Sequence, residues 1–222
     1  MHWSDVVAQR LAERGPTHIV STGITPSGEF HIGHLREILT GDMIAKAARK
    51  AGLDVEFVFI VDSADPLRKV YSFLDDSYAQ YIGHQLKQIP PPNQDGCPDM
   101  DRFAEGVSYA DHFLEPFKQA LEQIDVRPRF IDNYDSYASG KFSETARIAC
   151  NNAANIREII ERVSGRELSE DWFPWNPIDA NGSIDGIHVT GWNDPIVSWT
   201  DSEGNHGTSD VTKGEGKLPW RI

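Results

Sequence analysis

The sequence contains little cysteine and no long apolar segment. Only Cys97 and Cys150 occur among 222 residues, too few for a disulfide framework or a four-thiolate metal site within the chain. No apolar run approaches the roughly 20 residues that cross a bilayer, and the first residues lack the basic and apolar regions of a secretory signal. These absences favour a soluble protein of a reducing cytoplasm, with no membrane partner.

Lysine is scarce relative to arginine, and acidic residues are spread along the chain, which gives a net charge of -13. This charge disfavours a nucleic-acid partner, because phosphate binding draws on lysine and arginine clustered on one face, and we expect no DNA partner. At 1 M ionic strength, however, the Debye length is only about 3 Å, so an acidic protein can still approach RNA. The composition therefore predicts a halophilic source.

Apolar spacing predicts a βαβ unit in the first third of the chain. Residues 18–22 form a short buried strand in this interpretation, and residues 31–51 carry apolar side chains at helical spacing. Gly52 stands where a helix C-cap belongs. Residues 55–61 are almost continuously apolar, as in a strand covered on both faces by helices. Such a unit implies a parallel sheet.

The order of the later elements predicts an α/β fold with a doubly wound parallel sheet. We expect helices at residues 72–88, 109–124 and 142–163, and a strand at residues 129–132. The turn-rich residues 90–96 are predicted to be a surface insertion.

A change of composition predicts a second lobe. From Trp172 onward, short alternating runs rich in Gly, Asn, Asp and Thr indicate small β-hairpins. We therefore expect a main half-domain in residues 1–171, with an insertion at about residues 90–108, and a hairpin lobe in residues 172–215. Residues 216–222 begin a return to the main domain, and because this apolar segment has no capping turn we expect the sequence to be cut there.

The run from Gly23 to His34 ends in His31-Ile32-Gly33-His34 (HIGH), at the predicted start of a helix. Two imidazoles three residues apart share a helix face beside its free N–H groups and positive dipole end. They suit ATP whose α-phosphate is under attack, and Gly33 leaves room for the adenine base. A pair of surface histidines is the alternative, but the order of strand, loop and helix favours an ATP site.

Class I aminoacyl-tRNA synthetases and small-molecule nucleotidyltransferases share such a histidine motif, so its surroundings must distinguish them. Residues 21–28 followed by residues 31–34 resemble the signature of class I, archaeal-type lysyl-tRNA synthetases. Other segments are similar to the same family and follow its order along the chain: residues 65–70, 108–113, 139–141, 171–177 and 216–221.

The resemblance implies a Rossmann-like catalytic domain of a lysine–tRNA ligase. Such an enzyme uses ATP with Mg²⁺ to activate lysine as lysyl-adenylate and transfers it to tRNA(Lys). The resemblance implies that His31 and His34 are catalytic. The implied ATP-binding residues are Pro26, Ser27, Gly28, His31, Ile32, Gly33 and His34, and the implied lysine-binding residues are Gly23, Thr25 and Trp220.

The strand end agrees with a lysine site. Residues 21–28 contain no arginine or lysine, whereas a glutamyl relative would need a cation there to pair the substrate carboxylate. Trp220 suits packing against a lysine stem or ammonium, although a core tryptophan is an equal alternative without the resemblance. Asp62 and Asp65 suit an ammonium, a magnesium ion held through water or a helix N-cap, and stay unassigned.

Two features of the family are missing. Of the zinc ligands that other members place in the insertion, Cys97 and His112 remain, but Asn93 and Pro98 stand where the others would fall. The small lobe has no cysteine after residue 177, only Asp179, Asn181 and Asp185. We expect no zinc and no other protein-bound metal, with a weak metal near Cys97 as the alternative.

The sequence also lacks a Lys-Met-Ser-Lys-like phosphate loop and an anticodon-binding region. Two further hypotheses therefore stay open beside an N-terminal synthetase fragment. One is a small-molecule adenylyltransferase that uses the same histidines without RNA. The other is a non-catalytic fragment or paralogue that binds nucleotide or tRNA.

Overall fold

The structure, a computed structural model, describes residues 2–219. Its contacts divide the chain into two compact units, each assembled from segments that are separate in sequence. The sheet unit comprises Met1–Ser63, Pro90–Pro92 and Asp99–Asn133, and the hairpin unit comprises Ala64–Ile89, Asn93–Pro98 and Tyr134–Ile222. Contacts thus group residues 134–171 with the hairpins, and the functional boundary expected at residue 171 stays a prediction.

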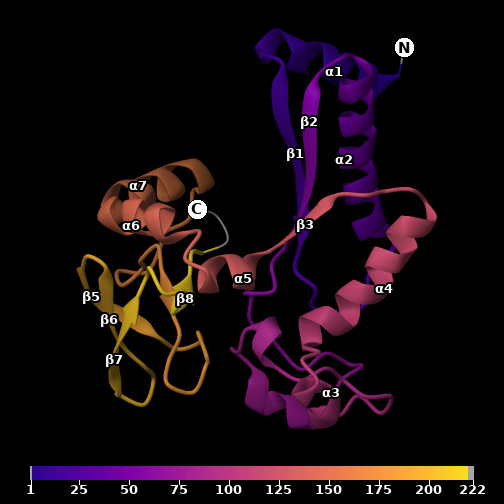
Figure 1. Ribbon diagram of the computed structural model, residues 1–222. Helices are drawn as coiled ribbons and strands as arrows, with labels where there is room; N and C mark the ends of the chain where they lie inside the picture. The colour runs from indigo at the N-terminus through magenta and orange to yellow at the C-terminus, as the bar shows by residue number, and fades with distance from the viewer. Residues whose placement is uncertain (1, 220–222) are drawn as a thin grey trace. The chain divides into compact units, whose positions relative to one another are not determined.

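A parallel sheet organises the sheet unit. Its strands are β1 (Thr17–Ile24), β2 (Asp54–Val61) and β3 (Arg129–Asp132), which pair in that order. Helix α2 (Ile32–Lys50) connects β1 to β2, and Figure 1 shows it lying alongside these two strands. The predicted βαβ unit and third strand are therefore confirmed. Helix α1 (Trp3–Arg14), which the sequence interpretation did not name, precedes β1.

The crossover from β2 to β3 contains the predicted helix at residues 109–124, observed as α4 (Tyr109–Gln123). The short helix α3 (Met100–Ala104) lies in the predicted insertion. Side chains of α4 such as Phe117 share one apolar core with Ile38 of α2 and with Phe57, Phe59 and Val61 of β2. This core covers one face of the sheet, because alternate residues of β2 point to the same side.

The opposite face of the sheet is open at Ile19 and Glu56 but buried at Val58 of β2. Ile19 of β1 is 67% exposed, and next to it Glu56 of β2 forms an ion pair with Arg129 of β3. The predicted covering of β2 on both faces therefore fails at Glu56, whereas Val58 on the same face is buried. Glu56 interrupts the apolar run at a position that alternates away from the core.

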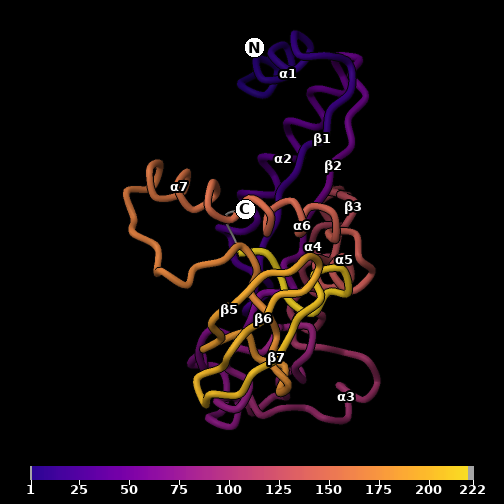
Figure 2. The backbone as a smooth tube through the Cα atoms, turned by 90° about the vertical axis from the view of Figure 1, so that its left-hand side faces the viewer, coloured from indigo at the N-terminus to yellow at the C-terminus, as the bar shows by residue number. Residues whose placement is uncertain are grey.

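The hairpin unit contains small antiparallel hairpins of the kind predicted after Trp172, while the predicted bounds of the lobe stay a prediction. Figure 2 shows β5, β6 and β7 side by side, and they pair antiparallel in this order. Trp175 and Val197 are buried in the core of this unit. Its strands are β4 (Asn176–Pro177), β5 (His188–Asn193), β6 (Ile196–Thr200), β7 (His206–Asp210) and β8 (Gly216–Lys217), and β4 pairs with β8.

Helices of the hairpin unit differ from prediction in two places. The helix expected at residues 142–163 is divided at Asn152, and the helix expected at residues 72–88 is replaced by two short 3-10 turns. The helical elements are α5 (Asn133–Ala138), α6 (Ser143–Asn151), α7 (Ala153–Ser164), η1 (Asp76–Tyr81) and η2 (Leu86–Gln88). No helix among the described residues has both the length and the apolar content needed to cross a membrane.

Candidate active site

The two motif histidines build the start of α2 themselves. His31 is the N-cap residue, and its Nδ1 atom accepts the N–H of Gly33 at 3.0 Å. His34 reaches back, and its Nδ1 atom accepts the N–H of His31 at 3.0 Å. Their rings stack with centroids 3.8 Å apart. The predicted place of the motif, in the first turn of the helix after β1, is confirmed.

These two hydrogen bonds determine where each imidazole carries its hydrogen. An Nδ1 atom that accepts a backbone N–H has no hydrogen of its own, so a neutral ring carries it on Nε2. Burial, followed by the neighbouring His31, lowers the pKa of His34 and favours its neutral form. The helix start therefore presents two Nε2–H donors beside the positive end of the helix dipole, which suits a phosphate.

The end of β1 brings Gly23 close to two neighbours. A Cβ atom on Gly23 would lie 2.7 Å from the carbonyl oxygen of Ile60, so the strand packing itself requires glycine here. The Gly23 N–H donates to Oε1 of Glu37 at 3.1 Å. Glu37 lies one turn after His34 on α2. The sequence interpretation missed Glu37, although its spacing from His34 places both on one helix face.

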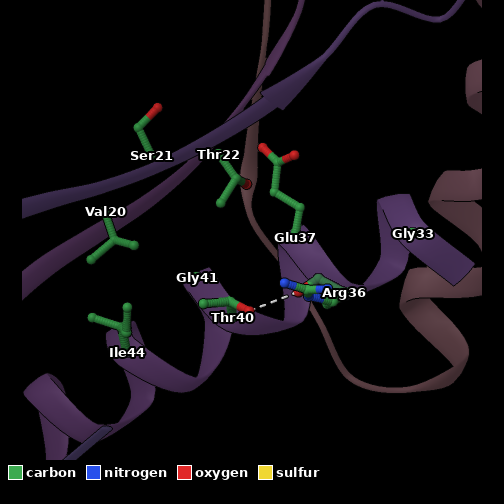
Figure 3. Close-up of a pocket in the computed structure, with 9 residues that line it drawn as sticks. All are labelled: Val20, Ser21, Thr22, Gly33, Arg36, Glu37, Thr40, Gly41 and Ile44. Carbon is green, nitrogen blue, oxygen red and sulfur yellow. Dashed lines mark hydrogen bonds between the residues drawn. The ribbon is translucent and has the colours of Figure 1, made fainter. Parts of the chain in front are cut away.

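A cavity of about 540 Å³ lies between β1 and α2 (Figure 3). In Figure 3, Glu37 points toward the strand that carries Ser21 and Thr22. Thr22 Oγ1 is buried and has no hydrogen-bond partner within the described chain. Of the predicted site residues, Gly33 lines this cavity. Its full lining is Val20, Ser21, Thr22, Gly33, Arg36, Glu37, Thr40, Gly41 and Ile44.

The loop between β1 and α2 carries most of the remaining predicted site residues. The Thr25 carbonyl accepts the Ser27 N–H at 2.9 Å, and Pro26 between them is fully buried. Gly28 continues this loop, while Ile32 is 79% exposed at the helix start. These residues lie together in the sheet unit. Trp220, the third predicted lysine-binding residue, lies outside the described residues.

The two aspartates left unassigned after β2 differ in their surroundings. The Asp62 N–H donates to the Ile24 carbonyl at 2.9 Å, which joins the carboxyl ends of β1 and β2. Asp65, in the hairpin unit, pairs with Lys217, whose side chain is buried. A carboxylate already paired with a buried ammonium is a poor candidate for a magnesium ligand.

The residues left from the zinc sites of the family have other partners. His112 Nδ1 lies 3.0 Å from Arg102 Nη1, and burial followed by this guanidinium lowers the pKa of His112. In the lobe, Asp179 Oδ1 accepts the N–H groups of Asn181 and Ser183 at 2.8 Å. Across residues 2–219 no group of three or more His, Cys, Asp or Glu is arranged to hold a metal. The expectation of no zinc stays a prediction.

The parallel sheet and the helix that two histidines cap are the arrangement of a Rossmann-like α/β domain of the class I tRNA synthetase type. The family described as "tRNA synthetases class I (K)" matches residues 1–222, and the chain belongs to this family.

The most similar relatives compared are archaeal. The chain is 40% identical to a lysine–tRNA ligase of Thermoplasma acidophilum, 39% to one of Archaeoglobus fulgidus and 37% to lysine–tRNA ligase 1 of Methanosarcina acetivorans. In each comparison the match covers 100% of this chain but only 40% to 43% of the relative. The chain therefore spans about two fifths of the length of these relatives.

Proposed function

We propose that this chain is the ATP- and lysine-binding part of a lysine–tRNA ligase. In the proposed reaction, the carboxylate of lysine attacks the α-phosphate of ATP, giving lysyl-adenylate and pyrophosphate. The lysyl group then passes to the terminal ribose of tRNA(Lys). Membership in the class I (K) synthetase family and similarity to archaeal lysine–tRNA ligases support this proposal.

The observation that carries the ATP assignment is the reciprocal capping of α2 by His31 and His34. Because both Nδ1 atoms are occupied, both Nε2–H groups are available to donate to phosphate oxygens as negative charge develops there. Gly33 between them leaves space for the adenine. Magnesium enters with ATP as part of the substrate. Pro26, Ser27 and Gly28 form the adjoining wall of the nucleotide site in this proposal.

The lysine assignment is supported by the charge at the end of β1. We place the substrate beside Gly23 and Thr25, with Trp220 as a further wall. Glu37 adds a carboxylate at this point, and one hydrogen bond from Gly23 leaves it acceptor capacity for a substrate ammonium. An acidic group suits lysine and disfavours an acidic amino acid.

We further propose a cytoplasmic enzyme from a halophilic source, with neither a membrane nor a DNA partner. The net charge of -13 supports the halophilic source, because self-repulsion of an acidic chain weakens in concentrated salt.

The test of the proposed function is isotope exchange between pyrophosphate and ATP in the presence of single amino acids. We expect lysine alone to support exchange. His34→Ala removes a donor to the transition state and is expected to lower the exchange rate roughly 100-fold. The matched control is His206→Ala, an exposed histidine of the hairpin unit, which is expected to leave the rate unchanged.

Exchange that needs a different acid would replace the proposal with a small-molecule adenylyltransferase. Binding of ATP without exchange for any amino acid would indicate a non-catalytic nucleotide-binding chain. An unchanged exchange rate in His34→Ala would contradict the assigned role of this histidine.

A further inference from the structure

The loop that joins β1 to α2, residues 25–31, contains no helix or strand. It nevertheless carries the residues proposed to form a wall of the nucleotide site. A loop of this kind needs contacts from elsewhere to hold one conformation, because ordering each residue costs roughly 1–2 kcal/mol of conformational entropy. The contacts come from α4, a helix about 80 residues later in the chain.

The first contact is a hydrogen bond from Tyr109 to the loop backbone. Its hydroxyl donates to the carbonyl oxygen of Ser27 at 2.8 Å. The Tyr109 side chain is fully buried. The hydrogen bond is partly buried, and a buried polar group that loses its partner costs about 1–3 kcal/mol, so this bond constrains the loop more strongly than a fully exposed one.

Local structure at the start of α4 holds Tyr109 in place. Ser108 is the N-cap residue, and its Oγ atom accepts the N–H of Asp111 at 3.2 Å. The Asp111 carboxylate in turn accepts the N–H of Ser108 at 3.1 Å. The ring of Phe113 packs against Tyr109 with centroids 4.9 Å apart. Residues 108–113, a segment that resembles the synthetase family, thus have a physical role, which is to hold Tyr109 in place.

The second contact lies at the other end of the loop. Phe30 stacks on Phe117 of α4, with centroids 4.1 Å apart and an interplanar angle of 15°. The edge of the same ring contacts His34, with centroids 5.2 Å apart. Helix α4 therefore holds the loop at two points, through a hydrogen bond at Ser27 and an aromatic stack beside the motif histidines.

We propose that Tyr109 is a positioning residue for the nucleotide site: its hydroxyl fixes the Ser27 carbonyl and so sets the path of the loop from Pro26 to Gly28. This inference rests on the proposed ATP site. Tyr109 itself touches no reacting atom in this proposal. A role in packing alone requires the aromatic ring of Tyr109 but not its hydroxyl, and this difference separates the two roles experimentally.

The experiment compares Tyr109→Phe with Tyr78→Phe in the whole protein. Tyr78 is equally buried and packs against Tyr81, so both variants lose one hydroxyl from a buried ring. Two quantities are measured: hydrogen–deuterium exchange of the amides of residues 25–34 without ligand, and the KM values for ATP and lysine in pyrophosphate exchange.

For Tyr109→Phe we expect faster amide exchange in the loop and a KM for ATP raised roughly three- to ten-fold. The KM for lysine and kcat are expected to change little. Tyr78→Phe is expected to alter neither the loop amides nor the KM for ATP. Phe30→Leu removes the aromatic stack on Phe117 and leaves Tyr109 unchanged. This variant is expected to accelerate amide hydrogen exchange in the loop as well.

Loop amides that exchange hydrogen at the wild-type rate in Tyr109→Phe would overturn the proposal, as would a KM for ATP that stays at the wild-type value in this variant. If the wild type shows no isotope exchange between pyrophosphate and ATP in the presence of lysine, the proposed function fails. The amide measurement needs no substrate and still decides the role of Tyr109.

Discussion

The Nδ1 atoms of His31 and His34 accept the hydrogen bonds that cap α2. A proton added to either ring would occupy the same atom. Protonation of His34 at Nδ1 removes the acceptor for the His31 N–H and opens the cap. Because the pKa of His34 is lowered by burial and by His31, the folded chain resists this protonation more than the unfolded chain does.

Stability is therefore predicted to fall as the pH decreases across a defined window. An unfolded histidine titrates near pH 6.5, so between that pH and the lowered pKa of His34 the unfolded chain binds more protons than the folded chain. The contribution of this group to stability is complete above the window and declines through it. Urea unfolding between pH 7.5 and 5 measures the effect.

The matched variant is His34→Gln, because glutamine at this position of a capping box accepts the same N–H but does not titrate. We expect a flatter dependence of unfolding free energy on pH for His34→Gln than for the wild type. Identical pH dependence of the unfolding free energy in both proteins would show that protonation of His34 does not destabilise the helix cap.

At the residue scale, the sequence predicted the histidine motif at the start of α2 but not the contribution of the neighbouring Glu37. His31, Gly33 and His34 could be placed because a strand, a turn and a helical pattern surround them. Glu37 could not be assigned, because its contact with Gly23 depends on a side chain of α2 reaching back to β1. Gly23 has a role in strand packing that only the structure shows, since β2 leaves no room for a Cβ atom.

At the scale of elements, the apolar periodicity of the sequence predicted the parallel sheet well. It failed for residues 72–88, where contacts with a distant segment replace the hydrogen bonds of a helix. The apolar residues Leu74, Tyr78 and Leu86 recur at intervals of four or eight, which suggests a helix. In the structure, Leu86 donates its N–H to Asp65 and Gly83 donates to Leu67, so this segment pairs with a loop instead. Such pairing involves residues too distant in sequence for a periodicity argument to detect.

The packing of α2 on the sheet leads to a prediction at Gly41. A Cβ atom there would lie 2.7 Å from Thr22 Cγ2 and 2.8 Å from Phe57 Cε2. We expect Gly41→Val to lower the free energy of unfolding by about 2 kcal/mol, because overpacking of a core typically costs 1–3 kcal/mol. Urea denaturation followed by circular dichroism provides the measurement.

Thr40→Val is the control for Gly41→Val. It places valine at the adjacent, exposed position of α2 by exchanging a hydroxyl for a methyl group, and surface changes usually stay within about 0.5 kcal/mol. Equal destabilisation by the two variants would mean that α2 does not pack against the sheet as closely as the structure shows.

For the whole molecule, the net charge of -13 predicts a response to salt. Repulsion among the carboxylates opposes the compact state, and at 1 M ionic strength screening over about 3 Å removes most of it. We expect the urea midpoint to rise between 0.1 and 2 M KCl.

Sucrose at matched osmolality serves as the uncharged control for this salt effect. If KCl stabilises the protein no more than sucrose does, electrostatic repulsion is not limiting and the proposed halophilic source loses its support. A midpoint that is high in dilute buffer and insensitive to KCl would have the same meaning.

The ion pair of Asp65 with the buried Lys217 joins residues 152 positions apart in a unit assembled from three separate segments. During synthesis, Asp65 leaves the ribosome long before Lys217. Strand β2 likewise cannot pair with β3 until residue 129 and those after it have been made. The growing chain must therefore keep Asp65 without Lys217, and β2 with an open strand edge, in water while the later segments are translated. This order favours late folding of the hairpin unit, whereas all segments of the sheet unit have been made once residue 133 is translated.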